Sequence, residues 1–339
     1  MISTAMYRRQ LLSVAALLGV ISVVCSADEQ TLNRALRGRK ANIVPDGVKY
    51  KVPRLLHFSA LSDAPPEYLS AMVDWSTEKA NSEGFEVMIW RDQDADELVR
   101  QMSSVIPGLA ESWEHVKADV DVGAGAKRAD FMRPLILYEL GGVYSDADMI
   151  PCDGYEGLVD MPGVVSFPHG TQVAKRVGSI GMLNGALWSA PPKHRLNQLA
   201  MEYFISLGPA ITTMPNVDAA GPVAFGIVAD MYFKEIGAGV PSIGEGAAFY
   251  ANQPVNGSWI QIADIRFVPE GEKAGLFYHL STASWSKGIA HKKTMSSPCV
   301  EDPSLIKPFL NWLCHPDSGA LKDKHVGLDQ CGESGKSIE

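Results

Sequence analysis

The stretch GGVYSDAD, residues 141–148, sets two aspartates one residue apart, after a glycine pair and a short apolar run. Two carboxylates this close repel each other, and a half-buried position without a counter-charge raises their pKa and costs stability. Hard divalent cations such as Mg²⁺ or Mn²⁺ bind carboxylate oxygens and complete their shell with substrate phosphates and water. Asp146 and Asp148 therefore predict a metal site, although Asp-x-Asp pairs are also common in surface turns.

A second pair of charged residues precedes the aspartates. Residues 127–140 are predicted to form a helix that the glycine pair closes with a left-handed cap, and Asp130 and Arg133 lie on one face of it. Arginine offers a fork of donors to a diphosphate or sugar, and aspartate accepts hydroxyl hydrogens; the alternative is a surface ion pair worth under about 1 kcal/mol. Pro134 disfavours helical geometry at Arg133, so the helix is expected to start late or to bend there.

The elements that must position these residues alternate between strand and helix. Residues i and i+2 of an extended strand share a face, so Asp146 and Asp148 are expected to project together from the carboxyl end of their strand, the edge where open α/β sheets bind ligands. The alternation predicts an α/β layer structure with a largely parallel sheet. Strands are predicted at 54–60, 85–91, 143–150, 163–168, within 259–268 and at 276–280, and helices at 66–81, 94–102, 127–140, 193–207 and 223–236.

Six stretches, in order, carry a resemblance to a known family. They are VPRLLHF at 52–58, FEVMIWRD at 85–92, RADFMRPLILYELGGVYSDADM at 128–149, NGALWSAPPKHR at 184–195, AGP at 220–222 and HLSTASW at 279–285. Together they resemble the DXD glycosyltransferases that include the fungal initiating α-1,6-mannosyltransferases, the inositol phosphoceramide mannosyltransferases and the α-1,4-galactosyltransferases. The glucosylating clostridial toxins are more distantly similar. The ordered combination is far more specific than any one motif.

The resemblance implies an α/β GT-A fold, with a Rossmann-like mixed sheet flanked by helices. It implies a retaining transfer of a hexose, mannose or galactose, from a nucleotide sugar such as GDP-mannose or a UDP-hexose to a hydroxyl of a glycan or glycolipid. The cofactor implied is Mn²⁺ or Mg²⁺ at the Asp-x-Asp. A metal that bridges the phosphates stabilises the charge on the departing diphosphate, so no side-chain acid is needed there.

The resemblance also implies roles for individual residues. The residues expected to act in catalysis are Asp146, Asp148 and Arg133, and the expected metal ligands are Asp146, Asp148 and His279. A histidine on an apolar strand, as His57 is, belongs more often to the core than to a site. The expected donor-binding residues are His57, Asp130, Arg133, Asp146, Asn184, Ser284 and Trp285, with Asn184 beside the donor sugar or acceptor and the loop at 284–285 over the diphosphate.

Bulk composition excludes several classes of protein. With 339 residues, 46% of them hydrophobic and 20% charged, the chain has the composition of a globular protein rather than of a disordered one. A formal charge of −9 argues against a protein that binds nucleic acid by neutralising phosphates. A small anionic ligand remains compatible with this charge where an arginine, a lysine or a metal receives it.

The N-terminus carries a secretory-route signal. Arg8 and Arg9 precede an uncharged, mostly apolar run at 11–27, which is either a cleaved signal peptide or an uncleaved membrane anchor; a buried N-terminal helix is the third interpretation. Positive charge before the run leaves the rest of the chain on the lumenal side, as a secreted or type II membrane protein of the ER or Golgi. The expected organisation is a signal or anchor at 1–27, a stem at 28–51, a catalytic domain at 52–315 and a polar tail at 316–339.

Four cysteines follow the N-terminal segment, and they allow three disulfide pairings or remain as free thiols. They are Cys152, Cys299, Cys314 and Cys331. Because they include no Cys-x-x-Cys pair, the sequence argues against a zinc knuckle. Asn256 begins a glycosylation sequon, a triplet that often arises by chance.

Three other functions are compatible with parts of the pattern. A haloacid-dehalogenase-like phosphatase also uses Asp-x-Asp with Mg²⁺, but the G-D-x-x-x-D loop that it needs is not found in the sequence. A glycoside hydrolase needs two carboxylates that flank the sugar about 5–10 Å apart, not one metal-facing pair. An inactive sugar-binding module on the same fold would bind donor without turning it over.

Overall fold

The computed structural model describes residues 51–59, 67–119, 124–147, 149–151, 154–159, 164–166, 187–238, 260–262, 264–267 and 277–279. All of them belong to one compact unit, Lys49–Glu339. The apolar segment 11–27, the four cysteines beyond it and the sequon lie outside the described residues. Within the described part, no helix is both long and apolar enough to cross a bilayer.

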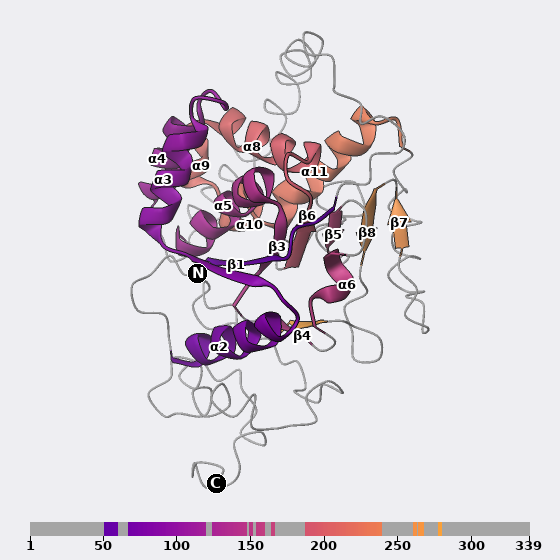
Figure 1. The fold of residues 1–339 in the computed structure, drawn as a ribbon. Coiled ribbons are helices and arrows are strands. Elements are labelled where there is room, and N and C mark those ends of the chain that lie inside the picture. Colours follow the sequence, from indigo (N-terminus) through magenta and orange to yellow (C-terminus); the bar gives the residue numbers. More distant parts are fainter. Residues whose placement is uncertain are drawn as a thin grey trace, which may run out of the picture. The chain divides into compact units, whose positions relative to one another are not determined.

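Strands and helices alternate along the described chain (Figure 1). The strands are β1 (Leu55–Ser59), β2 (Glu86–Trp90), β3 (Gly142–Ser145), β4 (Met149–Pro151), β5 (Val164–Ser166), β6 (Leu187–Ala190), β7 (Ile260–Ile262), β8 (Ile265–Phe267) and β9 (Phe277–His279). The helices are α2 (Glu67–Ser82), α3 (Asp92–Met102), α4 (Leu109–Lys117), α5 (Ala124–Leu140), α6 (Glu156–Val159), α8 (Arg195–Leu207), α9 (Ala210–Thr213), α10 (Asn216–Ala219) and α11 (Pro222–Glu235).

Seven strands form one mixed sheet in the order β2-β1-β3-β6-β5-β8-β7, and β4 pairs with β9 in a separate two-stranded sheet. Three of the six neighbouring pairs in the larger sheet are parallel and three are antiparallel. The α/β class with a mixed, Rossmann-like sheet flanked by helices is confirmed. The expectation of a largely parallel sheet holds only for the β2-β1-β3 half.

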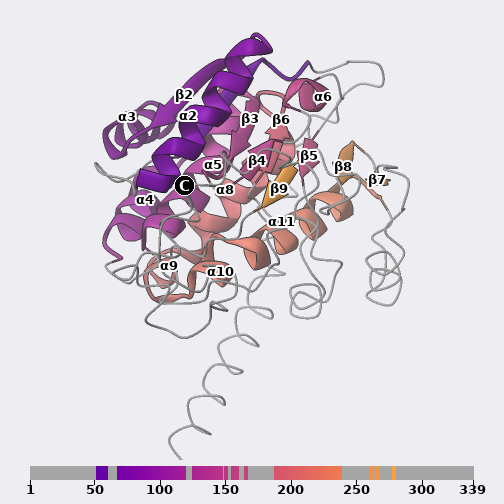
Figure 2. The ribbon, with the colours of Figure 1, turned by 90° about the horizontal axis from the view of Figure 1, so that it is seen from below.

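Two apolar layers cover the two faces of the sheet, because neighbouring residues of a strand point to opposite faces. Tyr144 of β3 packs with α5, α8 and α11, whereas its neighbour Val143 packs with residues of α2 and α6. Both views place α2 on the opposite side of the strands from α5, α8 and α11 (Figures 1 and 2). The β1–β2 crossover and the β2–β3 crossover therefore lie on different faces.

Helix α5 begins at Ala124 and is continuous through Pro134, so the expected late start is wrong. A proline in a helix removes one backbone N–H and crowds the preceding turn, at a cost of about 3 kcal/mol in an isolated helix. Here Pro134 and the three residues after it are fully covered by the protein, and their burial offsets that cost.

The glycine pair turns α5 directly into β3, as predicted. Gly141 has φ +67° and Gly142 has φ +100°, a region that favours glycine. A Cβ at Gly141 would lie 2.6 Å from Cδ of Pro192, and a Cβ at Gly142 would lie 2.7 Å from the carbonyl oxygen of Leu55. This compact turn lets β3 run back beside β1 with the residues that follow it next to α5.

The segment after β4 is fixed by a carboxylate at the end of α2. Glu83 Oε2 accepts hydrogen bonds from the backbone N–H groups of Tyr155 (2.6 Å) and Glu156 (3.0 Å). Gly154, with φ +89°, brings the chain so close that a Cβ there would lie 1.8 Å from Glu83 Oε1. Glu83 thereby holds the chain that leaves the Asp-x-Asp segment.

We predict that Gly154→Ala destabilises the protein by about 2–4 kcal/mol, because the methyl group adds left-handed strain and displaces the Glu83 carboxylate from two backbone donors. Gly84→Ala is the matched control, since Gly84 has φ +75° with nothing within 4 Å of a Cβ. It should cost only about 1–2 kcal/mol. Equal losses in urea unfolding would show that the contact with Glu83 has no part in the effect.

Candidate functional site

The site forms at the carboxyl edge of the three parallel strands. Strand β1 lies between β2 and β3, so the chain moves to one side of β1 and then to the other. Open α/β sheets bind ligands outside the carboxyl ends of the strands, at the point where the strand order reverses. Asp146 follows the last residue of β3 at this switch point.

The chain turns after β3, so Asp146 is not part of a long strand. Strand β3 stops at Ser145, and Met149, in β4, donates its N–H to the carbonyl oxygen of Asp146 at 3.1 Å. The expectation of one extended strand over 143–150 is therefore wrong, and with it the argument that Asp146 and Asp148 share a face of that strand. The physical reason is that β4 leaves the large sheet to pair with β9. Asp148 itself lies outside the described residues.

Arg133 lies at the centre of the site and bridges two aspartates. Its Nη2 is 2.7 Å from Asp130 Oδ1 and 2.9 Å from Asp146 Oδ1. The guanidinium lies 4.6 Å from the ring centroid of Tyr144 and 5.5 Å from that of Phe225, and the side chain is only 2% exposed. The predicted convergence of Asp130, Arg133 and Asp146 is thus present, from α5 and the end of β3.

The electrostatics of this cluster follow from its burial. Burial by itself lowers the pKa of Arg133, but the Asp146 and Asp130 carboxylates more than compensate and raise it above its ordinary value. Burial raises the pKa of Asp130 to about 7, although Arg133 opposes the shift; the nearby Asp146 adds to it. The arginine therefore pairs with two acids at once, and at Asp130 it offsets only part of the effect of burial.

Asp130 has a second partner that the sequence did not indicate. Asn216, the first residue of α10, donates from Nδ2 to Asp130 Oδ2 at 3.2 Å. The two oxygens of the Asp130 carboxylate are thus held by different neighbours, Arg133 and Asn216. Asn216 comes from a part of the chain 86 residues away, and nothing in the local pattern around it signalled this contact.

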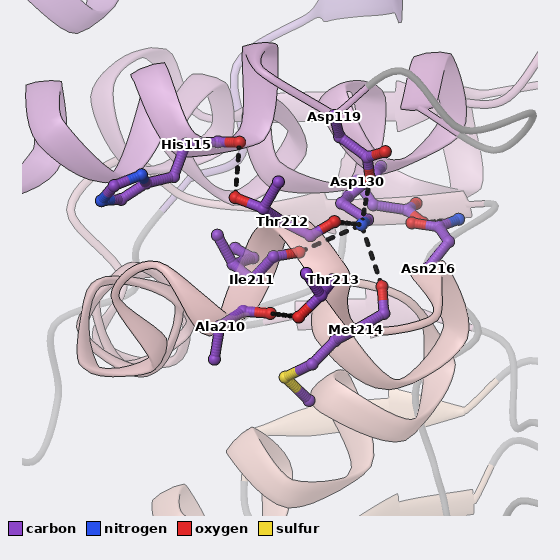
Figure 3. A network of polar contacts seen from close by, with 10 residues as sticks. His115, Asp119, Asp130, Ala210, Ile211, Thr212, Thr213, Met214 and Asn216 are labelled. Atoms are coloured by element: carbon purple, nitrogen blue, oxygen red, sulfur yellow. Dashed lines mark hydrogen bonds and ion pairs between the residues drawn. The ribbon is translucent and has the colours of Figure 1, made fainter.

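A buried lysine fixes the segment that carries Asn216 (Figure 3). Lys127, one turn before Asp130 on α5, pairs with Asp119 and donates to the carbonyl oxygens of Ile211 (3.0 Å), Thr212 (3.4 Å) and Met214 (2.9 Å). These carbonyls lie at the end of α9, where a helix leaves acceptors unpaired. The network attaches the α9–α10 segment to the face of α5 that carries Asp130.

The second sheet brings the expected metal ligand at 279 to the Asp-x-Asp. His279 is the last residue of β9, and its backbone pairs with Met149, the residue that follows Asp148. Among the described side chains, no group of three metal-ligating residues comes together. The Asp148 residue and the His279 side chain are outside that set. Carboxylate oxygens suit Mn²⁺ and an imidazole nitrogen can join them, so the residue types at 146, 148 and 279 are compatible with such a metal.

His57 is a fully buried residue of the central strand. Its Nε2 donates to the carbonyl oxygen of Gly141 at 2.9 Å, and its Nδ1 accepts from Trp90 Nε1 at 3.2 Å. Both ring nitrogens are thus occupied, and the residue connects β1 to the α5–β3 turn. A hydrogen bond from His57 to the sugar donor expected from the sequence would require one of these two bonds to break. Asn184, Ser284 and Trp285 lie outside the described residues.

The environment of His57 predicts a loss of stability in acid. Burial lowers its pKa from 6.5 to about 4, against the raising effect of its bond to Gly141. As the pH falls below 6.5, the unfolded histidine takes up a proton that the folded one refuses, so stability falls until about pH 4 and then levels. Between pH 7 and 4.5, the wild type should lose about 2–3 kcal/mol more than His57→Gln. Denaturation measured at both pH values tests this, and equal losses of stability in the two proteins would contradict it.

Comparisons with known proteins find a family model that matches the part of the chain with Asp130, Arg133 and the Asp-x-Asp. Residues 66–160 match the family described as "Glycosyltransferase sugar-binding region containing DXD motif". A search of curated proteins finds no match to the chain. Six chains among the solved structures match. One of these, the PaToxG glycosyltransferase, is 12% identical, with a TM-score of 0.41 over 60% of this chain and 76% of that one. Residues 66–160, which include Asp130, Arg133 and both aspartates of the motif, thus match the DXD-containing sugar-binding region of glycosyltransferases.

Proposed function

We propose that the protein is a metal-dependent hexosyltransferase that uses a nucleoside-diphosphate sugar as donor. The observation that carries the proposal is the convergence of Asp130, Arg133 and Asp146 at the switch point of the sheet, within the region that matches the family. The acceptor is a hydroxyl of a glycan or glycolipid. The donor is GDP-mannose or a UDP-hexose, and the transfer retains the anomeric configuration.

Three residues would hold the metal in this proposal, namely Asp146, Asp148 and His279. When bound, the metal supplies positive charge to the diphosphate that departs from the sugar. Arg133 Nη2 lies 2.9 Å from Asp146 Oδ1 and so orients the Asp146 carboxylate from one side. A ligand that is held in place before binding loses less entropy when the donor arrives.

Asp130 would bind the donor through its carboxylate oxygens, which accept hydrogens from sugar or ribose hydroxyls. Arg133 would act mainly as the charge that keeps both carboxylates in place, because the side chain is 2% exposed and lies over two aromatic rings. A rearrangement on donor binding would be needed to bring its guanidinium to the sugar. The acceptor hydroxyl would attack from the face that the diphosphate leaves, as the family resemblance implies.

The location proposed for this activity is the lumen of the ER or Golgi, with the segment 11–27 as a cleaved signal or a membrane anchor. This part of the proposal is supported by the two arginines before an uncharged run. An N-terminal sequence of the protein purified from a eukaryotic secretory host tests it. Cleavage near residue 27 supports a signal peptide, and an intact N-terminus in the membrane fraction supports an anchor.

The activity is tested with the full chain and a panel of GDP- and UDP-sugars in the presence of Mn²⁺. Release of GDP or UDP without acceptor measures donor hydrolysis, and added glycan or glycolipid hydroxyls should increase the rate. The donor that is hydrolysed identifies the sugar. Absence of hydrolysis and of transfer across the panel would contradict the proposal, and binding without turnover would favour an inactive sugar-binding module.

A further inference from the structure

The α9–α10 segment does more than cover α5, because it supplies a contact to the site. We infer that Asn216 is a positioning residue for donor binding, which acts through Asp130. The inference rests on the proposed function, since Asp130 is there a donor-binding group. Neither the family match, which ends at residue 160, nor the sequence motifs include Asn216.

The geometry around the Asp130 carboxylate carries the inference. Arg133 holds Oδ1 at 2.7 Å and Asn216 holds Oδ2 at 3.2 Å, from different elements. The side chain of Asp130 is 13% exposed, so it lies close to the surface of the site. A carboxylate held by one oxygen alone still turns about its terminal bond, whose torsion is broad. Two partners on different oxygens fix its plane.

Asn216 is itself held by the segment that Lys127 attaches to α5. The Lys127 ammonium is buried, and its partners are Asp119 and three backbone carbonyls from residues 211–214. Thr212 Oγ1 adds a hydrogen bond to the carbonyl oxygen of His115, at the end of α4, at 3.1 Å (Figure 3). The segment is therefore fixed on α5 and α4 without help from Asn216, so its amide is available to position Asp130.

The loss of the Asn216 amide should weaken donor binding and leave the fold unchanged. Removal of the amide leaves Lys127 and its partners intact, so the fold should persist, but Asp130 Oδ2 loses its donor. The carboxylate then samples more orientations, and ordering it again costs part of the binding free energy. The loss of one hydrogen bond of this kind corresponds to about a 3- to 10-fold weaker affinity.

The test is a double-mutant cycle on donor affinity, measured by calorimetry with the nucleotide sugar that the wild type binds, in Mn²⁺. Asn216→Ala should weaken binding about 3- to 10-fold with a melting temperature close to that of the wild type. In an Asp130→Ala background, the same change should alter affinity less than about 2-fold, because the group through which it acts is gone. Thr213→Ala is the control in the same segment, since its hydroxyl bonds only locally to the carbonyl of Ala210.

The outcomes separate the inference from the proposed function. If the wild type binds no nucleotide sugar, the proposed function fails. If the wild type binds and Asp130→Ala weakens binding, but Asn216→Ala does not, the inference is overturned. An equal loss from Asn216→Ala in both backgrounds also overturns it, because such additivity means that Asn216 acts independently of Asp130.

Discussion

Arg133→Met should lower the free energy of unfolding by about 3–5 kcal/mol and remove donor binding. The change removes the shared cation of Asp146, whose side chain is 32% exposed, and of Asp130, whose side chain is only 13% exposed. A largely buried charge that loses its partner is strongly destabilising. Methionine fills much of the space over Tyr144 and Phe225, so packing is not the main loss. Urea unfolding at pH 7 measures the effect.

Arg195 offers a matched control for this prediction. It also pairs with two carboxylates, Glu202 at 3.0 Å and Glu235 at 2.8 Å, but its side chain is 25% exposed. Water replaces the lost partner there, so Arg195→Met should cost about 1 kcal/mol or less. Equal losses for the two variants would mean that the Arg133 cluster is not a buried charge system.

Asp148→Asn should reduce metal-dependent donor turnover by about 100-fold or more while leaving the fold intact. The substitution removes a metal-ligating charge, and loss of one group that stabilises developing charge typically costs two to three orders of magnitude. Stability should be unchanged or slightly higher, since one of two carboxylates that lie two residues apart in the sequence, and that repel each other, is neutralised. Initial rates of donor hydrolysis in Mn²⁺, together with urea unfolding, measure both quantities.

Asp146→Asn is the informative comparison, because Asp146 is also a partner of Arg133. It should lose both turnover and stability, whereas Asp148→Asn loses turnover alone. Asp74→Asn, on an exposed position of α2, controls for the general effect of a lost carboxylate and should change neither. Unchanged turnover in Asp148→Asn would remove the proposed metal role of that residue.

Much of the fold could be predicted because local signals agreed with tertiary structure. Helix α5, closed by two glycines, and strand β1, with its buried centre, carry clear patterns and were placed within three residues. The convergence of Arg133 with Asp146 followed from two facts in the sequence, a helix face and a tight return into the next strand. At these positions the sequence pattern of each element favours the same structure as its tertiary packing does.

The features that were not predicted depend on distant partners. Strand β4 forms only because β9, more than a hundred residues later, pairs with it, so the turn at Asp146 had no local strand-ending signal apart from the Asp-x-Asp itself. Strand β6 is a fully buried run of four residues, which is too short for periodicity to identify. Pro134 is tolerated in α5 through packing, a tertiary effect that outweighs propensity.

Donor binding tested with and without metal is the measurement that addresses the central claim most directly. Calorimetric titration of the full chain with GDP- and UDP-sugars should reveal one that binds in Mn²⁺. Its affinity should fall at least about 10-fold in EDTA and in Asp148→Asn, with unfolding unchanged. If no nucleotide sugar binds, or if the one that binds does so equally well without metal and without the Asp148 carboxylate, the account of a metal-diphosphate site at the Asp-x-Asp turn is contradicted.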